Sequence, residues 1–231
     1  MKFEHTEVMN FEGALRGMRN PLASWDKSDS YENYSVDFEE EFEIRYPYYR
    51  IGASDLDLAQ RLIKGGPEHR KFLRQIFVSV DITAPLYIWK EIDTYKVGTT
   101  ANSTSTMHKL ASTPITKDCF EMDDYDGDGE LYIREPYELD YTIKDVWNNL
   151  INDLETIRQK YNETNNKKFW KELVRLLPEG WLQTRTVTMN YEILRNIYTQ
   201  RRYHKLTEWH TFCDWILSLP HAKELITYGI D

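Results

Sequence analysis

The sequence is poor in cysteine, with only Cys119 and Cys213 in 231 residues. Two cysteines exclude a disulfide framework of the kind found in small secreted proteins, and they favour a reducing, intracellular setting. Cys213 lies among Phe212, Trp215 and Ile216, a context that predicts a packed thiol and not a nucleophile. The cysteine content therefore predicts a cytoplasmic protein.

Long apolar runs and an excess of basic residues are also missing. No apolar run reaches about 18 residues, the length that a membrane helix needs, and the N-terminus MKFEHTEVMNF has no signal-peptide pattern. The formal net charge is −9, whereas nucleic-acid binding requires a basic face. We therefore expect neither a membrane nor a nucleic acid as partner, and an anionic nucleotide would have to be held by a few focused cations.

The length suits one sizeable core, so we expect a single domain over residues 1–231 with an acidic insertion at about 112–141. Alternating apolar and charged residues indicate strand character over 34–51, and the β-prone run 76–85 predicts a second strand region. Apolar periodicity predicts helices over 55–66, 86–97 and 142–163, and another that begins at 167 and stops at Pro178. Ser54 is the expected N-cap of the first of these helices.

The segment from Arg175 to Leu219 carries the most informative pattern. With about 100° per residue, Asn190, Leu194, Ile197 and Arg201 fall on one side of a predicted helix, followed by His204. A face that buries leucine and isoleucine also buries its polar neighbours, and a buried arginine needs an acidic side chain or an anionic ligand. The alternative is an arginine that caps the helix end, with a histidine satisfied in the core.

The same segment resembles the C-terminal half of the flavin-dependent thymidylate synthases. An arginine, Leu-Pro, Thr-Met-Asn and a helix that ends in arginine near a histidine follow one another in the family's order. The resemblance implies that Asn190, Asn196 and His204 bind FAD and that Arg201 binds the phosphate of deoxyuridylate (dUMP). We expect the guanidinium and the two carboxamides to face inward.

Two positions in this segment depart from the family. Glu192 stands where the family has an arginine, and Arg175 lies three residues before Pro178 instead of four. The resemblance still assigns Arg175 to the nucleotide.

A second block, over about 54–108, also follows the order of the family, with a helix, a loop containing histidine, a strand, Ala-Pro and a helix. The family's basic Arg-His-Arg triplet is replaced here by residues of which only Lys96 is positively charged. The small hydroxyl and amide groups of TTANSTST suit a phosphate or a pyrimidine edge, although such runs also form ordinary polar loops. By resemblance, Asn102 and Ser105 bind dUMP and Lys96 binds the flavin.

The resemblance implies an α/β (α+β) fold with a central mixed or antiparallel sheet flanked by helices. It further implies a homotetramer whose sites form between subunits, and an FAD-dependent methyltransferase that converts dUMP to dTMP with methylenetetrahydrofolate and NADPH. No residue is assigned to catalysis, and such enzymes use no cysteine nucleophile. The alternative, which the eroded basic triplet favours, is a diverged non-catalytic homologue that binds a nucleotide or flavin or keeps only the scaffold.

The acidic insertion contains DYDGDGELYIRE, which matches the calcium loop of an EF-hand position by position. Its predicted ligands are Asp124, Asp126, Asp128, the carbonyl of Glu130 and both carboxylate oxygens of Glu135. The alternative is a hairpin tip, because DGDG is a strong turn signal and the residues that follow have strand character. If the loop does bind calcium, a calcium-responsive interaction protein is a third hypothesis.

Overall fold

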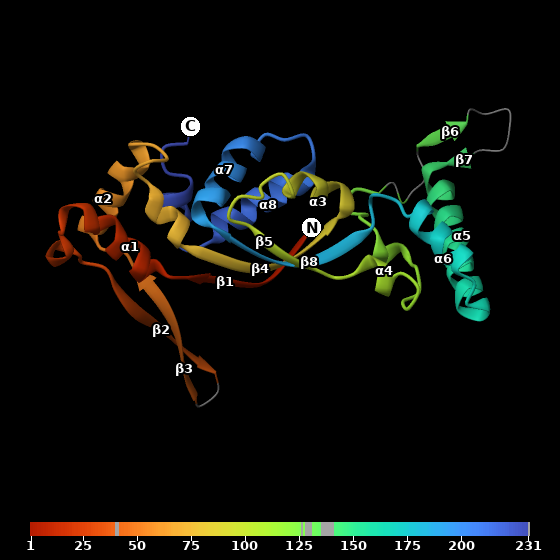
Figure 1. The fold of residues 1–231 in the computed structure, drawn as a ribbon, viewed down its shortest axis with the longest axis horizontal. Helices are drawn as coiled ribbons and strands as arrows, with labels where there is room; N and C mark the ends of the chain where they lie inside the picture. Colours follow the sequence, from red (N-terminus) through yellow and green to blue (C-terminus); the bar gives the residue numbers. More distant parts are fainter. Residues whose placement is uncertain (40–41, 126, 128–130, 135–140, 231) are drawn as a thin grey trace. The chain divides into compact units, whose positions relative to one another are not determined.

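The computed structural model describes residues 1–39, 42–125, 127, 131–134 and 141–230. The chain divides into two compact units, each described by itself below: unit 1 comprises residues 1–2, 82–93 and 102–185, and unit 2 comprises residues 3–81, 94–101 and 186–231. Figure 1 shows the course of the strands and helices.

The main sheet has four strands in the order β1-β4-β8-β5. The strands are β1 (Lys2–Met9), β4 (Phe77–Pro85), β8 (Leu182–Asn190) and β5 (Thr100–Ser103). Every second residue of β4 from Val78 to Ala84 is buried, which is the period of a strand with one face in the core. The predicted α/β fold with a central sheet and flanking helices is confirmed. Strands β4 and β8 each contribute residues to both units, so the two units do not establish two domains. A single domain over 1–231 remains a prediction.

The described residues of unit 2 form four α-helices and a separate hairpin. The helices are α1 (Phe11–Arg19), α2 (Ala53–Lys64), α7 (Tyr191–Arg201) and α8 (Thr207–Ser218), with short turns at Asn20–Leu22, Trp25–Lys27, Lys71–Gln75 and Ala222–Ile226. The hairpin joins β2 (Tyr31–Glu39) to β3 (Phe42–Arg50), and its antiparallel pairs run from Tyr31 opposite Arg50 to Glu39 opposite Phe42. The strand character predicted for 34–51 is thus confirmed.

A buried charge network fixes the start of α2. Asp55 is fully buried, and one of its carboxylate oxygens accepts a hydrogen bond of 2.6 Å from Nε of Arg19, which is 3% exposed. The other oxygen accepts hydrogen bonds from the hydroxyls of Ser28 and Ser30, at 2.7 and 2.6 Å. This network joins α1, α2 and the loop between them.

The prediction that Ser54 caps α2 is wrong. The helix begins at Ala53, two residues before the predicted start at 55, and the N–H groups of Ser54 and Asp55 donate to the carboxylate of Asp29 at 2.9 and 3.0 Å. The free N–H groups of a helix start can donate to any suitably placed acceptor. Here a carboxylate from a distant loop takes the role that a local side chain was expected to play.

Unit 1 contains the helices α3 (Leu86–Ile92), α4 (Thr106–Lys109), α5 (Ile143–Thr164) and α6 (Lys167–Leu176), with a short turn at Lys117–Cys119. Thr142 and Asp145 form a capping box at the start of α5, which ends where Asn165 adopts a left-handed conformation. The predicted helices at 142–163 and before Pro178 are therefore confirmed. Among the described residues, no helix combines the length and the apolar character needed to cross a bilayer.

Helices α5 and α6 pack against each other (Figure 1) over the core of unit 1. That core contains Leu110, Ile115, Phe120, Ile151, Leu154, Leu173 and Trp181. Glu155 of α5 accepts hydrogen bonds from Arg158 and from the N–H of Ile115. These bonds, with that from Arg158 the strongest influence, lower the pKa of Glu155 to about 2, so the carboxylate stays charged across the physiological range.

The acidic insertion ends in a short hairpin. Strand β6 (Tyr132–Arg134) pairs antiparallel with β7 (Tyr141–Thr142), in line with the strand character expected there. Four of the predicted calcium ligands, Asp126, Asp128, Glu130 and Glu135, lie outside the described residues, and Asp124 is exposed. Within the described ranges no group of three or more candidate ligands is found. The calcium site therefore remains a prediction.

The two cysteines differ in exposure, and we expect them to differ in reactivity. Cys213 is buried in α8, and burial, with a smaller contribution from Asp214, raises the pKa of its thiol to about 11. Cys119 is partly exposed. Because the thiolate is the reactive form, titration with a thiol reagent at pH 8 is expected to label Cys119 alone in the native protein and both cysteines after unfolding. Rapid native labelling of both would contradict this.

Candidate functional site

Helix α7 forms the base of the candidate site in unit 2. Asn190 precedes the helix and caps it, because its Oδ1 accepts a hydrogen bond of 3.1 Å from the N–H of Ile193. Asn190, Leu194 and Ile197 are all buried, at 8%, 0% and 1% exposure. The expected polar and apolar face is thus present along most of the helix.

Arg201, the last residue of α7, is held by aromatic side chains. Its Nε donates a hydrogen bond of 3.0 Å to the hydroxyl of Tyr95. The guanidinium carbon lies 4.7 Å from the centre of the Trp209 ring and 5.8 Å from that of Tyr95. The Tyr95 hydroxyl in turn donates to Gln200 at 2.9 Å. A flat guanidinium held in this way has a fixed orientation, as recognition of a phosphate requires.

The loop that contains Lys96 runs along α7. The predicted helix 86–97 ends at Ile92, so Lys96 lies in a loop and is exposed. Tyr95 contacts the last turn of α7, while Gly98 meets the first: a Cβ atom at Gly98 would lie 3.2 Å from Nδ2 of Asn190. Gly98 has a positive φ of 78°, which glycine adopts without strain. Lys96, Asn190 and Arg201 thus belong to one region of unit 2.

His204 lies just beyond α7 and shares Trp209 with Arg201. Its ring centre is 6.2 Å from that of Trp209, and its Nδ1 accepts a hydrogen bond of 3.2 Å from the N–H of Leu206. Its carbonyl oxygen is 2.8 Å from Nε2 of His210. The backbone of the turn therefore orients the imidazole beside the cluster of Arg201, Tyr95 and Trp209, called the Arg201 cluster below.

Asn196 does not face inward, and this part of the prediction is wrong. It is exposed, whereas its neighbours Arg195 and Ile197 are buried. Six residues separate it from Asn190, which is a turn of about 240° around the helix. The two carboxamides therefore lie on different sides of α7, and a flavin role for Asn196 remains a prediction.

Glu192 forms a buried ion pair that the sequence did not reveal. Its carboxylate accepts hydrogen bonds of 2.9 and 3.1 Å from Nε of Arg70 and one of 3.0 Å from Nη2. The two side chains are 8% and 14% exposed. A glutamate on a buried helix face needs a cationic partner. The only sequence feature that pointed to this ion pair was the glutamate at position 192, where the family has an arginine.

The remaining predicted residues belong to unit 1. Asn102 lies on β5 and Ser105 caps α4 by accepting a hydrogen bond of 3.4 Å from the N–H of His108; both are exposed. Arg175 is exposed on α6 and pairs with Glu172, one turn away. An exposed pair of this kind contributes little, and the role of all three in nucleotide binding remains a prediction.

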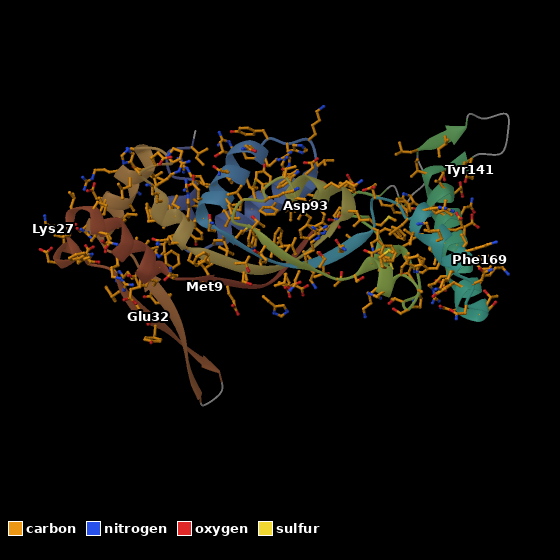
Figure 2. The ribbon with its side chains drawn as sticks, viewed as in Figure 1. Met9, Lys27, Glu32, Asp93, Tyr141 and Phe169 are labelled. Atoms are coloured by element: carbon orange, nitrogen blue, oxygen red, sulfur yellow. The ribbon has the colours of Figure 1, made fainter. Side chains whose placement is uncertain are left out.

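Arg185 on β8 is another positioned arginine, and its partners lie within unit 1. Its Nη1 donates a hydrogen bond of 2.8 Å to Asp93, a residue labelled in Figure 2. The guanidinium carbon lies 4.2 Å from the centre of the Trp89 ring. With a carboxylate and an aromatic face as partners, Arg185 is a structural residue.

The chain has the fold of the flavin-dependent thymidylate synthases. It is similar to a structure of ThyX from Helicobacter pylori complexed with FAD and dUMP, with a TM-score of 0.65 and 16% identity over 100% of this chain and 99% of that one. A second ThyX structure from Helicobacter pylori, also with FAD and dUMP, gives a TM-score of 0.60 at 17% identity and covers 95% of this chain and 93% of that one. No family model and no curated protein matches the sequence.

Proposed function

We propose that the protein binds FAD and dUMP and acts as a flavin-dependent thymidylate synthase. The observation that carries the proposal is the fixed orientation of Arg201 between Tyr95 and Trp209. This arginine stands where the sequence resemblance puts the phosphate-binding arginine, in a fold whose solved examples hold FAD and dUMP. A guanidinium recognises phosphate through two parallel N–H donors, and its restraint reduces the entropy lost on binding.

The residues around α7 fit a flavin. Asn190 uses its Oδ1 to cap the helix, which leaves its amide nitrogen to donate to a ring carbonyl. Lys96 supplies a positive charge on the adjoining loop, and His204 lies beside the Arg201 cluster. These residues, with Asn196, would hold FAD, which when bound supplies the redox chemistry of methyl transfer.

The other parts of the proposal rest on the resemblance. Arg201, Asn102, Ser105 and Arg175 would bind dUMP, while methylenetetrahydrofolate would supply the one-carbon unit and NADPH the reducing equivalents. The active assembly would be a cytoplasmic homotetramer. In that assembly residues of more than one protomer would complete each site.

A second function is a homologue that binds nucleotide or flavin without turnover. The observation that favours it is the loss of positive charges that the family has. Glu192 replaces an arginine of the family and is already paired with Arg70, and only Lys96 of the basic triplet is positively charged. With fewer cations near the ligands, negative charge that develops in the transition state would be less stabilised.

Titration of the purified protein with FAD distinguishes these functions. We expect saturable binding, seen as quenching of flavin fluorescence, followed by dTMP formation when dUMP, methylenetetrahydrofolate and NADPH are added without oxygen. Binding of FAD and dUMP without dTMP would support the non-catalytic homologue. Failure to bind either ligand would remove both functions and leave only the fold.

A further inference from the structure

An open cavity of about 410 Å³ lies in unit 2 along α7. Its lining includes three arginines and three neutral polar side chains: Arg70, Arg195, Arg202, Asn196, Thr199 and Gln200. Among the described residues that line it there is no aspartate or glutamate. Like-charged groups gathered in one cavity repel each other unless counter-charges are present. Arg70 has such a counter-charge in Glu192, with which it is paired.

Arg195 is the most constrained of the three arginines. Its side chain is only 8% exposed, and its Nη1 donates hydrogen bonds of 2.7 and 2.8 Å to the carbonyl oxygens of Ile226 and Tyr228. Within the described part of the chain, its Nε and Nη2 donate no hydrogen bond. Carbonyl oxygens orient a guanidinium but do not neutralise it, so Arg195 keeps a full charge in a nearly buried position.

The surroundings of Arg195 are short of negative charge. Burial lowers its pKa, the charge of Arg70 lowers it further, and Glu192 opposes both effects. Glu192 is already engaged on both oxygens by Arg70. One carboxylate, that of Glu192, therefore serves both Arg70 and Arg195.

The neutral lining side chains add hydrogen-bond donors. The Oε1 atom of Gln200 accepts from Tyr95 at 2.9 Å, so its amide nitrogen remains to donate. Asn196 is exposed on the same side of the helix, and within the described residues no hydrogen bond occupies its side chain. Two guanidinium groups and two amides along one cavity make a set of donors suited to an oxyanion.

We propose that this cavity binds a phosphate group, as free phosphate or as a phosphate monoester, held by Arg195 and Arg202 with the amides of Asn196 and Gln200. A phosphate suits the cavity better than a carboxylate because it is close to a dianion and can accept from several donors at once. The volume of about 410 Å³ leaves room for a small organic group. Arg201 is not among the residues that line the cavity, so the proposal does not rest on the proposed function.

Equilibrium dialysis with radiolabelled inorganic phosphate, at constant ionic strength in chloride, tests the proposal. We expect saturable binding of one phosphate per chain. Arg195→Lys keeps the charge but loses the paired N–H donors of the guanidinium, and Arg202→Gln removes one charge. Each variant is expected to bind phosphate about tenfold or more weakly. Arg61→Gln is the matched control, because Arg61 is exposed and pairs with Asp57 in the same unit, so affinity should be unchanged.

Arg202→Gln also guards against misfolding, because Arg195 anchors the C-terminal segment and its replacement could unfold the protein, whereas Arg202 is partly exposed. Glycerol 3-phosphate is the second probe: tighter binding than inorganic phosphate identifies a monoester, and equal binding identifies the free ion. The absence of saturable binding, or an equal loss in the Arg61→Gln control, would overturn the proposal.

Competition with FAD separates this inference from the proposed function, since Asn196 belongs to both residue sets. Phosphate binding that persists in the presence of saturating FAD supports a separate anion site. Displacement of phosphate by FAD, one for one, would show that the cavity is part of the flavin site and would overturn the inference. Phosphate binding in a protein that binds neither FAD nor dUMP would instead remove the proposed function and leave the inference in place.

Discussion

Replacement of Arg201 by alanine is expected to weaken dUMP binding by about 100-fold, while FAD binding stays within about threefold of wild type. The guanidinium is held by Tyr95 and Trp209 in a single orientation. Its loss would remove the two charge-assisted hydrogen bonds that we propose it makes to the phosphate. Isothermal titration of the FAD-loaded protein with dUMP measures the effect.

Two further variants make the Arg201 result specific. Arg201→Lys keeps the charge but cannot fork onto a phosphate, so we expect an intermediate loss of about tenfold. Tyr95→Phe removes the hydroxyl that receives a hydrogen bond from Arg201 and donates one to Gln200; a loss of a few-fold is expected from the looser guanidinium. If Arg201→Ala binds dUMP as tightly as wild type, the phosphate assignment is wrong.

Replacement of Asp55 by alanine is expected to lower the free energy of unfolding by about 3–5 kcal/mol. Asp55 and Arg19 are 0% and 3% exposed, so the substitution leaves a buried guanidinium without its counter-charge. Asp57→Ala is the matched control on the same helix, because Asp57 and Arg61 are each 67% exposed; a change within about 1 kcal/mol is expected. Urea unfolding followed by circular dichroism measures both, and equal effects would contradict the prediction.

Asp55 also predicts how stability depends on pH. Burial alone would raise its pKa, but hydrogen bonds from Ser30, Ser28 and Arg19 outweigh burial and lower the pKa below its ordinary value. The contribution of a carboxylate with a lowered pKa is fully present above the unfolded value, about 3.9, and is lost as the pH falls through the folded value. The wild type should therefore lose stability below about pH 4, and Asp55→Ala should lose less of it.

Local patterns gave the elements of α7 correctly, since a burial period depends only on neighbouring residues. Leu194 and Ile197 are buried as their spacing predicted. Long-range pairs could not be seen in the same way. Asp29 replaces Ser54 as the cap of α2 from 25 residues away, and Arg70 finds Glu192 across 122 residues of sequence. No local pattern distinguishes these partners from other charged residues.

The fold was predicted from the family resemblance, although the solved examples share only 16% and 17% of their residues with this chain. The inward orientation of Asn196 was a different kind of error. The spacing of six residues from Asn190 already placed it on another side of the helix, so helical geometry opposed what the family pattern suggested. The cavity around Arg195 could not be predicted, because the residues that close it come from separate elements.

The pairing of Glu192 with Arg70 constrains any attempt to rebuild the family's basic pattern in this chain. Glu192→Arg alone would set two guanidinium groups against each other at a nearly buried position and would also remove a carboxylate whose charge favours the protonated form of Arg195. Engineering toward the ancestral charge pattern would therefore have to exchange both positions together, and the two single mutants should each be less stable than the double mutant. An evolutionary path between the two arrangements would likewise pass through a single mutant of lower stability.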